Sequence, residues 1–324
     1  MKTILVLPII LLVFVTSCNA QQSTELTEIK NFGANPGNLK MYVHYTPTKI
    51  NAPKPLVIAM HGCTQSASNM AELTGWNKLA DSNNFVVIYP QQKFINNPNL
   101  CFNWFNSNDI NKGKGECESI YQMIQYACAQ YNIDTTKIFV TGLSAGALMS
   151  VVMMATHPQL INNGAIFAGA AYKIAENPIS AAGVMLGTSK MTAQELTNKV
   201  LNQNPTYTGK YPKVIIYQGL QDPVVNNKNA KIIVNQWAGV HNIDTTADKI
   251  ETSFMNINDI TRKQYHNSNG ESIITLYEVN HLGHQLVIQP GNAYNEGGST
   301  GIYGVNKLFH STYQTAKEFG ITNR

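Results

Sequence analysis

A serine between two glycines, in residues 142–146 (GLSAG), separates two apolar segments of different character. The residues before it, 138–141 (IFVT), are typical of a buried strand, and those after it, 147–156 (ALMSVVMMAT), are typical of a packed helix. A G-x-S-x-G sequence at a strand-to-helix turn exposes the serine hydroxyl, because the small residues let the backbone turn sharply. We therefore predict that Ser144 is a nucleophile. The alternative is an ordinary tight turn that contains a serine.

A nucleophilic serine needs a histidine as its base and a carboxylate that orients the histidine. One predicted strand, 213–218 (KVIIYQ), is followed by Asp222, and another, 273–279 (IITLYEV), is followed by His284. The carboxyl ends of parallel strands meet at one edge of a sheet, so we expect these side chains to lie near Ser144. The chain order Ser, Asp, His is that of α/β-hydrolases. It predicts an α/β fold with a mostly parallel central sheet and helices on both faces.

Two histidines compete for the role of base. We favour His284 over His281, because His284 lies deeper in the loop and Gly283 beside it allows a close approach to the serine. His281 is then an ordinary loop histidine. Asp222 precedes Pro223, so a simple turn is the alternative for this aspartate. We expect the remaining candidates to be structural or at the surface: His44, His157, His241, His266 and His310.

The oxyanion formed when a serine attacks an ester must be held by hydrogen-bond donors. One donor is the backbone N–H of the residue after the nucleophile, which here is Ala145. The second donor comes from the loop after an early strand. Residues 56–60 (LVIAM) form that predicted strand, and the backbone N–H of Cys63 in the following loop is the candidate. An ordinary exit from a strand, with no donor role, is the alternative.

Four motifs occur in a fixed order along the chain: HGCTQSA at 61–67, YPQQ at 89–92, CFNWF at 101–105 and the serine motif. With these motifs the chain closely resembles the poly(3-hydroxybutyrate) depolymerase family of esterases, over roughly residues 38–320. The CFNWF block is the most specific motif, because many hydrolases share the serine motif. The resemblance implies an extracellular esterase that hydrolyses polyhydroxyalkanoate, or its oligomers, through an acyl-enzyme.

The resemblance also assigns site residues. The family's serine, aspartate and histidine fall on Ser144, Asp222 and His284, and its oxyanion cysteine falls on Cys63. The family often has a tryptophan after the histidine, where this chain has Gln285. We expect this departure to alter the wall of the substrate cleft.

Trp104, between Phe102 and Phe105, is expected to line an apolar substrate cleft, with core packing as the alternative. Aromatic faces suit a polyester, but they suit a feruloyl ring equally. The alternative function is therefore a feruloyl or acetylxylan esterase that acts on plant polysaccharide. A non-catalytic surface lipoprotein is the alternative of another class. No cofactor or metal is expected, since the chain has no Cys-x-x-Cys and no pair of histidines at ligand spacing.

Four cysteines follow residue 20, and four cysteines allow three pairings between which a sequence alone cannot choose. Cys63 and Cys101 both lie on loops near the predicted site, so we expect them to form a disulfide. Cys117 and Cys128 share one predicted helix. Their eleven-residue spacing places them roughly 16 Å apart, which is too far for a disulfide.

The first 20 residues combine a short basic segment with an apolar one and are predicted to be a secretory signal peptide. Residues 15–18 (VTSC) resemble a lipobox, so a lipidated Cys18 anchored in the cell envelope and free secretion both stay open. We expect 21–37 to be an N-terminal extension and 38–324 to be a single catalytic domain. No separate binding module is recognisable in this sequence, so soluble oligomers are expected to be better substrates than crystalline polymer. The net charge of +4 forms no basic stripe, so nucleic acid is not an expected partner.

Overall fold

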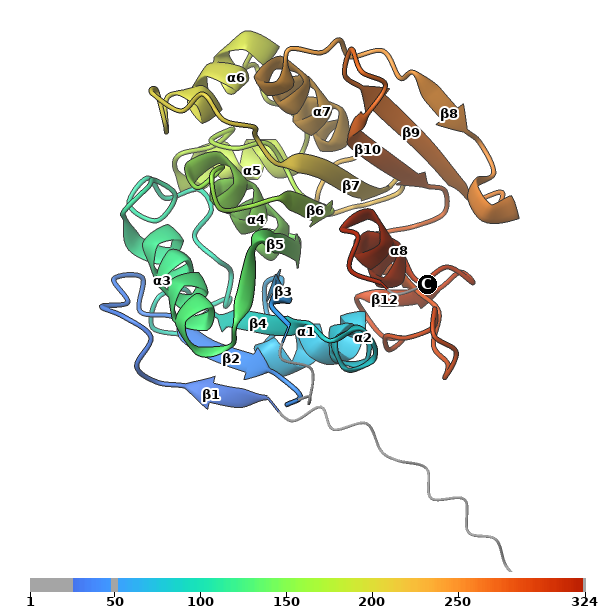
Figure 1. Ribbon diagram of the computed structural model, residues 1–324. Coiled ribbons are helices and arrows are strands. Elements are labelled where there is room, and N and C mark those ends of the chain that lie inside the picture. The colour runs from blue at the N-terminus through green and yellow to red at the C-terminus, as the bar shows by residue number, and fades with distance from the viewer. Residues whose placement is uncertain (1–25, 48–51, 323–324) are drawn as a thin grey trace, which may run out of the picture.

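The computed structural model describes residues 26–47 and 52–322, which form one large twisted sheet covered by helices (Figure 1). The predicted signal peptide and Cys18 lie outside the described residues. The sheet has ten strands in the order β1-β2-β4-β3-β5-β6-β7-β10-β9-β8. Its six central strands are parallel: β3 (Lys54–Met60), β4 (Val86–Gln91), β5 (Ile133–Leu143), β6 (Asn163–Phe167), β7 (Lys213–Gly219) and β10 (Ser272–Val279). The predicted α/β-hydrolase fold with a mostly parallel sheet is confirmed.

The edge strands are antiparallel to their neighbours. They are β1 (Thr27–Ile29) and β2 (Lys40–His44) on one side, and β9 (Ile260–His266) and β8 (Lys249–Glu251) on the other. Because β1 pairs with β2, the sheet begins before residue 38, where we had placed the start of the domain. A separate two-stranded parallel sheet joins β11 (Leu286–Ile288) to β12 (Gly304–Asn306).

Helices cover both faces of the sheet, because the buried residues of a strand alternate between two apolar cores. In β3, Leu56, Ile58 and Met60 point into one core, and Val57 and Ala59 point into the other. The first core is covered by α3 (Gly115–Gln130), α4 (Ala145–Thr156), α6 (Ala193–Leu201) and α7 (Lys228–His241). The second is covered by α1 (Ala67–Thr74), α2 (Trp76–Asn83) and α8 (Ser311–Glu318). A shorter helix, α5 (Pro178–Met185), and a 3-10 turn at Phe254–Asn256 complete the described elements.

The carboxyl ends of the parallel strands are in register at one edge. Met60 at the end of β3 pairs with Gly142, and Gly219 at the end of β7 pairs with Val279 at the end of β10. Between them, Phe167 at the end of β6 connects β5 to β7. The loops that follow these strands therefore leave the sheet on the same side, as the sequence predicted.

Helix α4 begins at Ala145, two residues earlier than the apolar pattern predicted, and its first turn packs directly against the end of β3. A Cβ atom on Gly146 would lie only 2.2 Å from the carbonyl oxygen of Met60. A Cβ on Gly142 would lie 2.3 Å from the carbonyl carbon of Gly146. Contacts this short exclude any side chain larger than hydrogen, so both glycines are required by packing.

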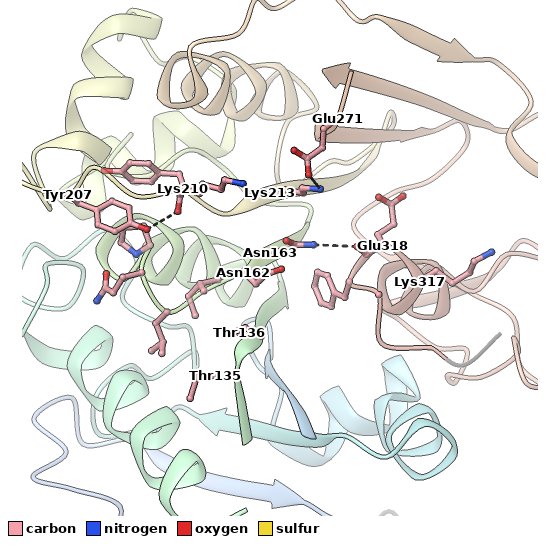
Figure 2. A pocket seen from close by; sticks show the side chains of 17 residues that line it. Thr135, Thr136, Asn162, Asn163, Tyr207, Lys210, Lys213, Glu271, Lys317 and Glu318 are labelled. Carbon is pink, nitrogen blue, oxygen red and sulfur yellow. Dashed lines mark hydrogen bonds and ion pairs between the residues drawn. The ribbon is translucent and has the colours of Figure 1, made fainter. Parts of the chain in front are cut away.

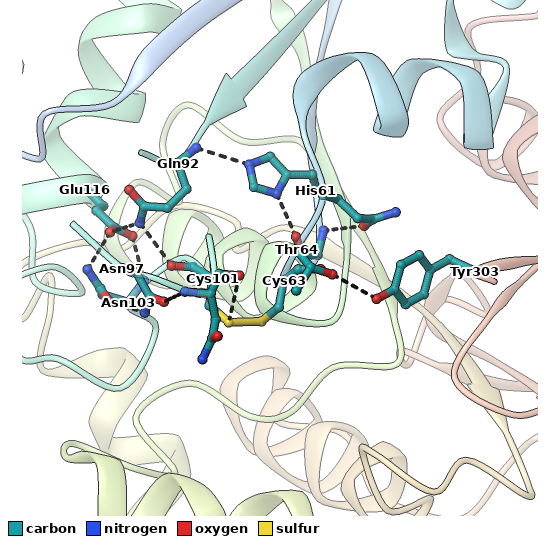
Figure 3. The surroundings of a disulfide bond; sticks show 12 residues. His61, Cys63, Thr64, Gln92, Asn97, Cys101, Asn103, Glu116 and Tyr303 are labelled. Carbon is teal, nitrogen blue, oxygen red and sulfur yellow. Dashed lines mark hydrogen bonds between the residues drawn. A yellow bond between two sulfur atoms is a disulfide. The ribbon is translucent and has the colours of Figure 1, made fainter. Parts of the chain in front are cut away.

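The cysteines are arranged as the sequence predicted. Cys63 and Cys101 form a disulfide with their Cα atoms 4.2 Å apart, which joins the loop after β3 to the CFNWF segment (Figure 3). Cys117 and Cys128 both lie on α3 and are free thiols. Cys117 is buried, with its sulfur 3.2 Å from the hydroxyl of Thr156.

Among the described residues, no helix combines the length and the apolar character that crossing a bilayer requires.

Removal of the disulfide is predicted to destabilise the fold. The bond closes a loop of 38 residues, and the lost restraint on the unfolded chain corresponds to about 4 kcal/mol in the chain-entropy treatment. Urea unfolding of a Cys63→Ala/Cys101→Ala double variant should show a free energy of unfolding lowered by about 2–4 kcal/mol. The control is Cys128→Ala, which removes a half-buried free thiol. A double variant as stable as the control would contradict the prediction.

Candidate active site

Ser144 lies at the turn between β5 and α4 with a backbone conformation that few residues adopt. Its φ is 54° and its ψ is −121°. Its backbone N–H donates to the carbonyl of Phe167 at the end of β6, at 2.9 Å, which holds the turn against the neighbouring strand. A non-glycine residue in such a conformation is strained, and strain of this kind persists where the surroundings impose it. This geometry is the one expected of an exposed nucleophile on a strand-to-helix turn.

Asp222 and His284 are brought together from the loops after β7 and β10. His284 Nδ1 lies 2.8 Å from Asp222 Oδ2. The other carboxylate oxygen, Oδ1, accepts the backbone N–H groups of Val224 at 2.8 Å and Val225 at 2.9 Å. The Asp222 side chain is fully buried, while the His284 side chain is 11% exposed. With Nδ1 donating to the carboxylate, the lone pair of the neutral imidazole is on Nε2.

Asp222 occupies the turn that its Asp-Pro sequence suggested, but it also pairs with a histidine. His281, the competing candidate, is exposed, and its Nδ1 lies 3.5 Å from the side-chain nitrogen of Gln221. The structure therefore pairs the aspartate with His284, the histidine that the sequence analysis favoured.

Gly283, which we expected to allow a close approach of His284 to the serine, is itself not confined by packing. A Cβ on Gly283 would meet no heavy atom closer than 3.8 Å, which is an ordinary contact. The glycine that the site requires is Gly219, where a Cβ would lie 2.4 Å from the carbonyl oxygens of Leu282 and Gly283. The histidine loop is thus packed directly on the end of β7, which fixes its distance from the Asp222 turn.

The loop after β3 approaches the serine closely. A Cβ on Gly62 would lie 3.5 Å from the Cβ of Ser144. Within the described parts of the chain, the backbone N–H groups of Cys63 and Ala145 have no hydrogen-bond acceptor. These are the two donors that the sequence predicted for an oxyanion site. Buried or half-buried N–H groups are usually paired, so a pair without acceptors beside the half-buried Ser144 is suited to bind a negative oxygen.

A buried histidine that the sequence analysis did not weigh holds this loop. His61 is fully buried, and its Nε2 accepts the backbone N–H of Gln92 at 3.1 Å. The proton is therefore on Nδ1, which lies 2.7 Å from the carbonyl oxygen of Gly62 and donates to it. Burial lowers the pKa of His61 to about 4, so its ring is neutral near pH 7. Because a trans peptide directs its C=O and N–H oppositely, this bond also orients the N–H of Cys63.

Gln92 is held in turn by the buried carboxyl group of Glu116 (Figure 3). Its side-chain nitrogen donates to Glu116 at 2.5 Å and to the carbonyl of Cys101 at 3.0 Å. Glu116 also accepts the backbone and side-chain nitrogens of Asn103, both at 2.8 Å. Burial and the nearby Asp109 raise the pKa of Glu116 to about 8. His61, Gln92 and Asn103 lie within three of the sequence motifs, which were the signal that could have identified them, whereas Glu116 lies outside the motifs.

Trp104 is 8% exposed, packs into the larger core and contacts the ring of Phe105 edge-on, with 5.3 Å between ring centroids. Most of its surface thus takes part in core packing. Among the other histidines, His44 contacts Asp81, and His157, His241 and His310 contact Thr156, Pro212 and Thr74 respectively. All these contacts are structural. The described residues contain no cluster of His, Cys, Asp or Glu that could hold a metal ion.

Two cavities differ in their relation to this site. A cavity of about 560 Å³ is lined by Asn163 and Lys213, the first residues of β6 and β7, so it lies at the amino edge of the sheet (Figure 2). A smaller cavity of about 280 Å³ includes Thr64, the neighbour of Cys63, and lies at the carboxyl edge. Only the second is on the side of Ser144.

Comparisons with known proteins identify the family of the chain. A profile of the family described as "Esterase PHB depolymerase" matches residues 40–253. The poly(3-hydroxyalkanoate) depolymerase C of Paucimonas lemoignei is 38% identical over 314 residues, which are 97% of this chain and 73% of that protein. The feruloyl esterase B of Talaromyces funiculosus is 29% identical over 237 residues, which are 71% of this chain and 66% of that protein.

Among solved structures, an acetyl xylan esterase from Aspergillus awamori superimposes with a TM-score of 0.73 at 24% identity. The superposition covers 80% of this chain and 94% of that structure, and it shows a shared fold. The family profile and the similarity to the depolymerase over nearly the whole chain also identify the family. This chain belongs to the PHB depolymerase family of esterases, which are carboxylic ester hydrolases with an α/β-hydrolase fold.

Proposed function

We propose that the protein is a serine esterase that hydrolyses polyhydroxyalkanoate, or its oligomers, through an acyl-enzyme. The observation that carries this proposal is the 2.8 Å pair of Asp222 and His284 at the sheet edge where Ser144 lies on a strained turn. The similarity to a poly(3-hydroxyalkanoate) depolymerase over 97% of the chain supports the substrate class. Neither a cofactor nor a metal is part of the proposed chemistry.

In the first step, Ser144 Oγ attacks the ester carbonyl while His284 Nε2 takes the hydroxyl proton. Asp222 keeps the imidazole oriented through Nδ1 and stabilises the cation that forms. The buried carboxylate is held by Val224 and Val225, so it need not reorganise as the charge develops. The carbonyl oxygen becomes an oxyanion that accepts the N–H groups of Cys63 and Ala145.

The tetrahedral intermediate collapses when the proton on His284 passes to the leaving alcohol oxygen. The bond from the carbonyl carbon to this oxygen breaks, and the acyl group stays on Ser144. A water molecule then attacks the acyl-enzyme, His284 takes its proton, and Ser144 leaves with that proton. The products are a hydroxyl-terminated and a carboxylate-terminated fragment of the polyester.

A second substrate class has specific support. The relatives include a feruloyl esterase at 29% identity, and the acetyl xylan esterase shares the fold over 80% of this chain. The same residues would perform the same chemistry on an acyl group carried by plant polysaccharide. We place the polyester first because the depolymerase similarity is higher and covers more of the chain. Trp104 remains a proposed contributor to the cleft wall through its small exposed fraction.

We further propose that the protein is exported from the cytosol. The Cys63–Cys101 disulfide suits an oxidising compartment, and the first 20 residues have the character of a signal peptide. Free secretion and anchoring through a lipidated Cys18 are the two forms of this proposal. Its partner is the ester substrate, and nucleic acid is not proposed as one.

Substitution of the proposed nucleophile and base is predicted to abolish activity. Ser144→Ala and His284→Ala should each lower kcat for p-nitrophenyl butyrate by about 10⁴-fold or more, because the triad members act as a unit. Ser144→Ala should also prevent covalent labelling by a fluorophosphonate. His281→Ala is the matched control and should keep kcat within about threefold of the wild type. An inactive His281→Ala with an active His284→Ala would refute the assignment of the base.

The proposed substrate class predicts an order of kcat/KM values on four substrates. Hydroxybutyrate trimer methyl ester should exceed methyl ferulate and acetylated xylan by at least about tenfold, a difference of roughly 1.4 kcal/mol in transition-state binding. p-Nitrophenyl butyrate serves as the general esterase control. High activity on methyl ferulate or acetylated xylan with none on the trimer would move the assignment to the second class. Absence of activity and of fluorophosphonate labelling would instead favour a non-catalytic binding protein.

A further inference from the structure

The cavity of about 280 Å³ at the carboxyl edge has no role in the mechanism above. It lies between the loop after β3, the exposed side of α1 and the segment 299–303 that precedes β12. Its lining residues in the first two elements are Thr64, Gln65, Asn69, Glu72 and Leu73. Segment 299–303 forms the opposite wall, which we call the outer wall.

The outer wall is hydrogen-bonded to the loop that carries His284. The side-chain nitrogen of Gln285, next to His284, donates to the carbonyl of Ile302 at 3.1 Å. The backbone N–H of Leu286 donates to the carbonyl of Tyr303 at 2.8 Å. The histidine loop is therefore continuous, through hydrogen bonds, with the wall of the cavity.

Tyr303 connects the same wall to the oxyanion loop (Figure 3). The hydroxyls of Tyr303 and Thr64 lie 3.0 Å apart, and the Thr64 hydroxyl donates to the carbonyl of Cys63 at 2.7 Å. Because that donation uses the single proton of Thr64, Tyr303 donates to Thr64. The cavity thus lies next to the residue whose N–H is proposed to hold the oxyanion, and its wall spans from there to His284.

The chemistry of the lining suits an uncharged chain with carbonyl groups. Leu73, Ile302 and the ring of Tyr303 supply apolar surface. The Asn69 side-chain oxygen is occupied by Ser66, and its Nδ2 has no acceptor among the described residues, so it is available to donate. Among the described residues that line the cavity, Glu72 is the one with a charge, and none is Lys, Arg or His. An anionic group would therefore find no cationic partner there.

We propose that this cavity is a substrate subsite that binds a neutral ester unit of the polyester next to the unit attacked by Ser144. The inference rests on the proposed function and adds to it the position at which neighbouring monomers are recognised. The volume is near the lower end, about 300 Å³, of small-molecule sites. The subsite therefore accommodates a short stretch of chain.

Ile302 offers the sharpest test, because its side chain is 82% exposed and replacing it does not disturb the core. Ile302→Trp fills the subsite and should lower kcat/KM for hydroxybutyrate trimer methyl ester by about tenfold or more. p-Nitrophenyl acetate has no neighbouring monomer, so its kcat/KM should stay within about twofold. Ile302→Ala removes apolar contact and should raise KM for the trimer about threefold with little change in kcat.

The matched control is Ile250→Trp, at a residue 56% exposed on the edge strand β8. It should leave both substrates unchanged. If Ile302→Trp leaves trimer hydrolysis at the wild-type rate, or slows p-nitrophenyl acetate equally, the subsite is refuted. Failure of the proposed function is distinguishable, since the wild-type protein itself would then hydrolyse p-nitrophenyl acetate without hydrolysing the trimer, or would hydrolyse neither.

Discussion

The first turn of α4 packs against the end of β3 at a distance that only glycine allows, and the site depends on this contact. Gly146 lies against the carbonyl of Met60, and Gly142 lies against Gly146. This packing forces the chain through the strained conformation of Ser144 and places the loop after β3 beside it. The proposed nucleophile and the proposed oxyanion donors are therefore positioned by one steric constraint. Strands β6, β7 and β10 pair in register, so their carboxyl ends lie at this same edge of the sheet. The loops after β7 and β10 carry Asp222 and His284.

Two contacts of histidine rings hold the polar groups of the site in place. One joins the His61 ring to the Gly62 carbonyl, and the other joins the His284 ring to the Asp222 carboxylate. His61 is neutral and donates to the Gly62 carbonyl, which orients the Cys63 N–H without placing a charge near the oxyanion. Asp222 is charged in its proposed role, and its carboxylate is compensated by two backbone N–H groups and by the imidazole. Because both contacts are present in the free protein, the proposed mechanism requires little reorganisation as charge develops. The disulfide joins this loop to the CFNWF segment, where the backbone N–H of Asn103 donates to Glu116.

Sequence reasoning succeeded where the signal is local or follows from strand order. The strand before Ser144 and the helix after it show in the periodicity of neighbouring residues, and the pairing of Asp222 with His284 follows from parallel strands ending at one edge. It did not find the contact of Tyr303 with Thr64, because 239 residues separate them and no pattern encodes their approach. The three-residue strand β1 is too short to show a period. Packing leaves no room for a side chain at Gly219 but leaves room for one at Gly283. This difference depends on how the loops after β7 and β10 pack, which the sequence pattern does not encode.

The central claim is that Ser144 attacks an ester whose carbonyl oxygen is held by Cys63 and Ala145. A crystal structure of the protein inactivated by p-nitrophenyl butylphosphonate tests it most directly, since the phosphonyl oxygen occupies the place of the oxyanion. We predict phosphorus bonded to Ser144 Oγ and its free oxygen about 2.7–3.1 Å from the backbone nitrogens of Cys63 and Ala145. An adduct on another residue, or an oxygen directed away from these two N–H groups, would contradict the account.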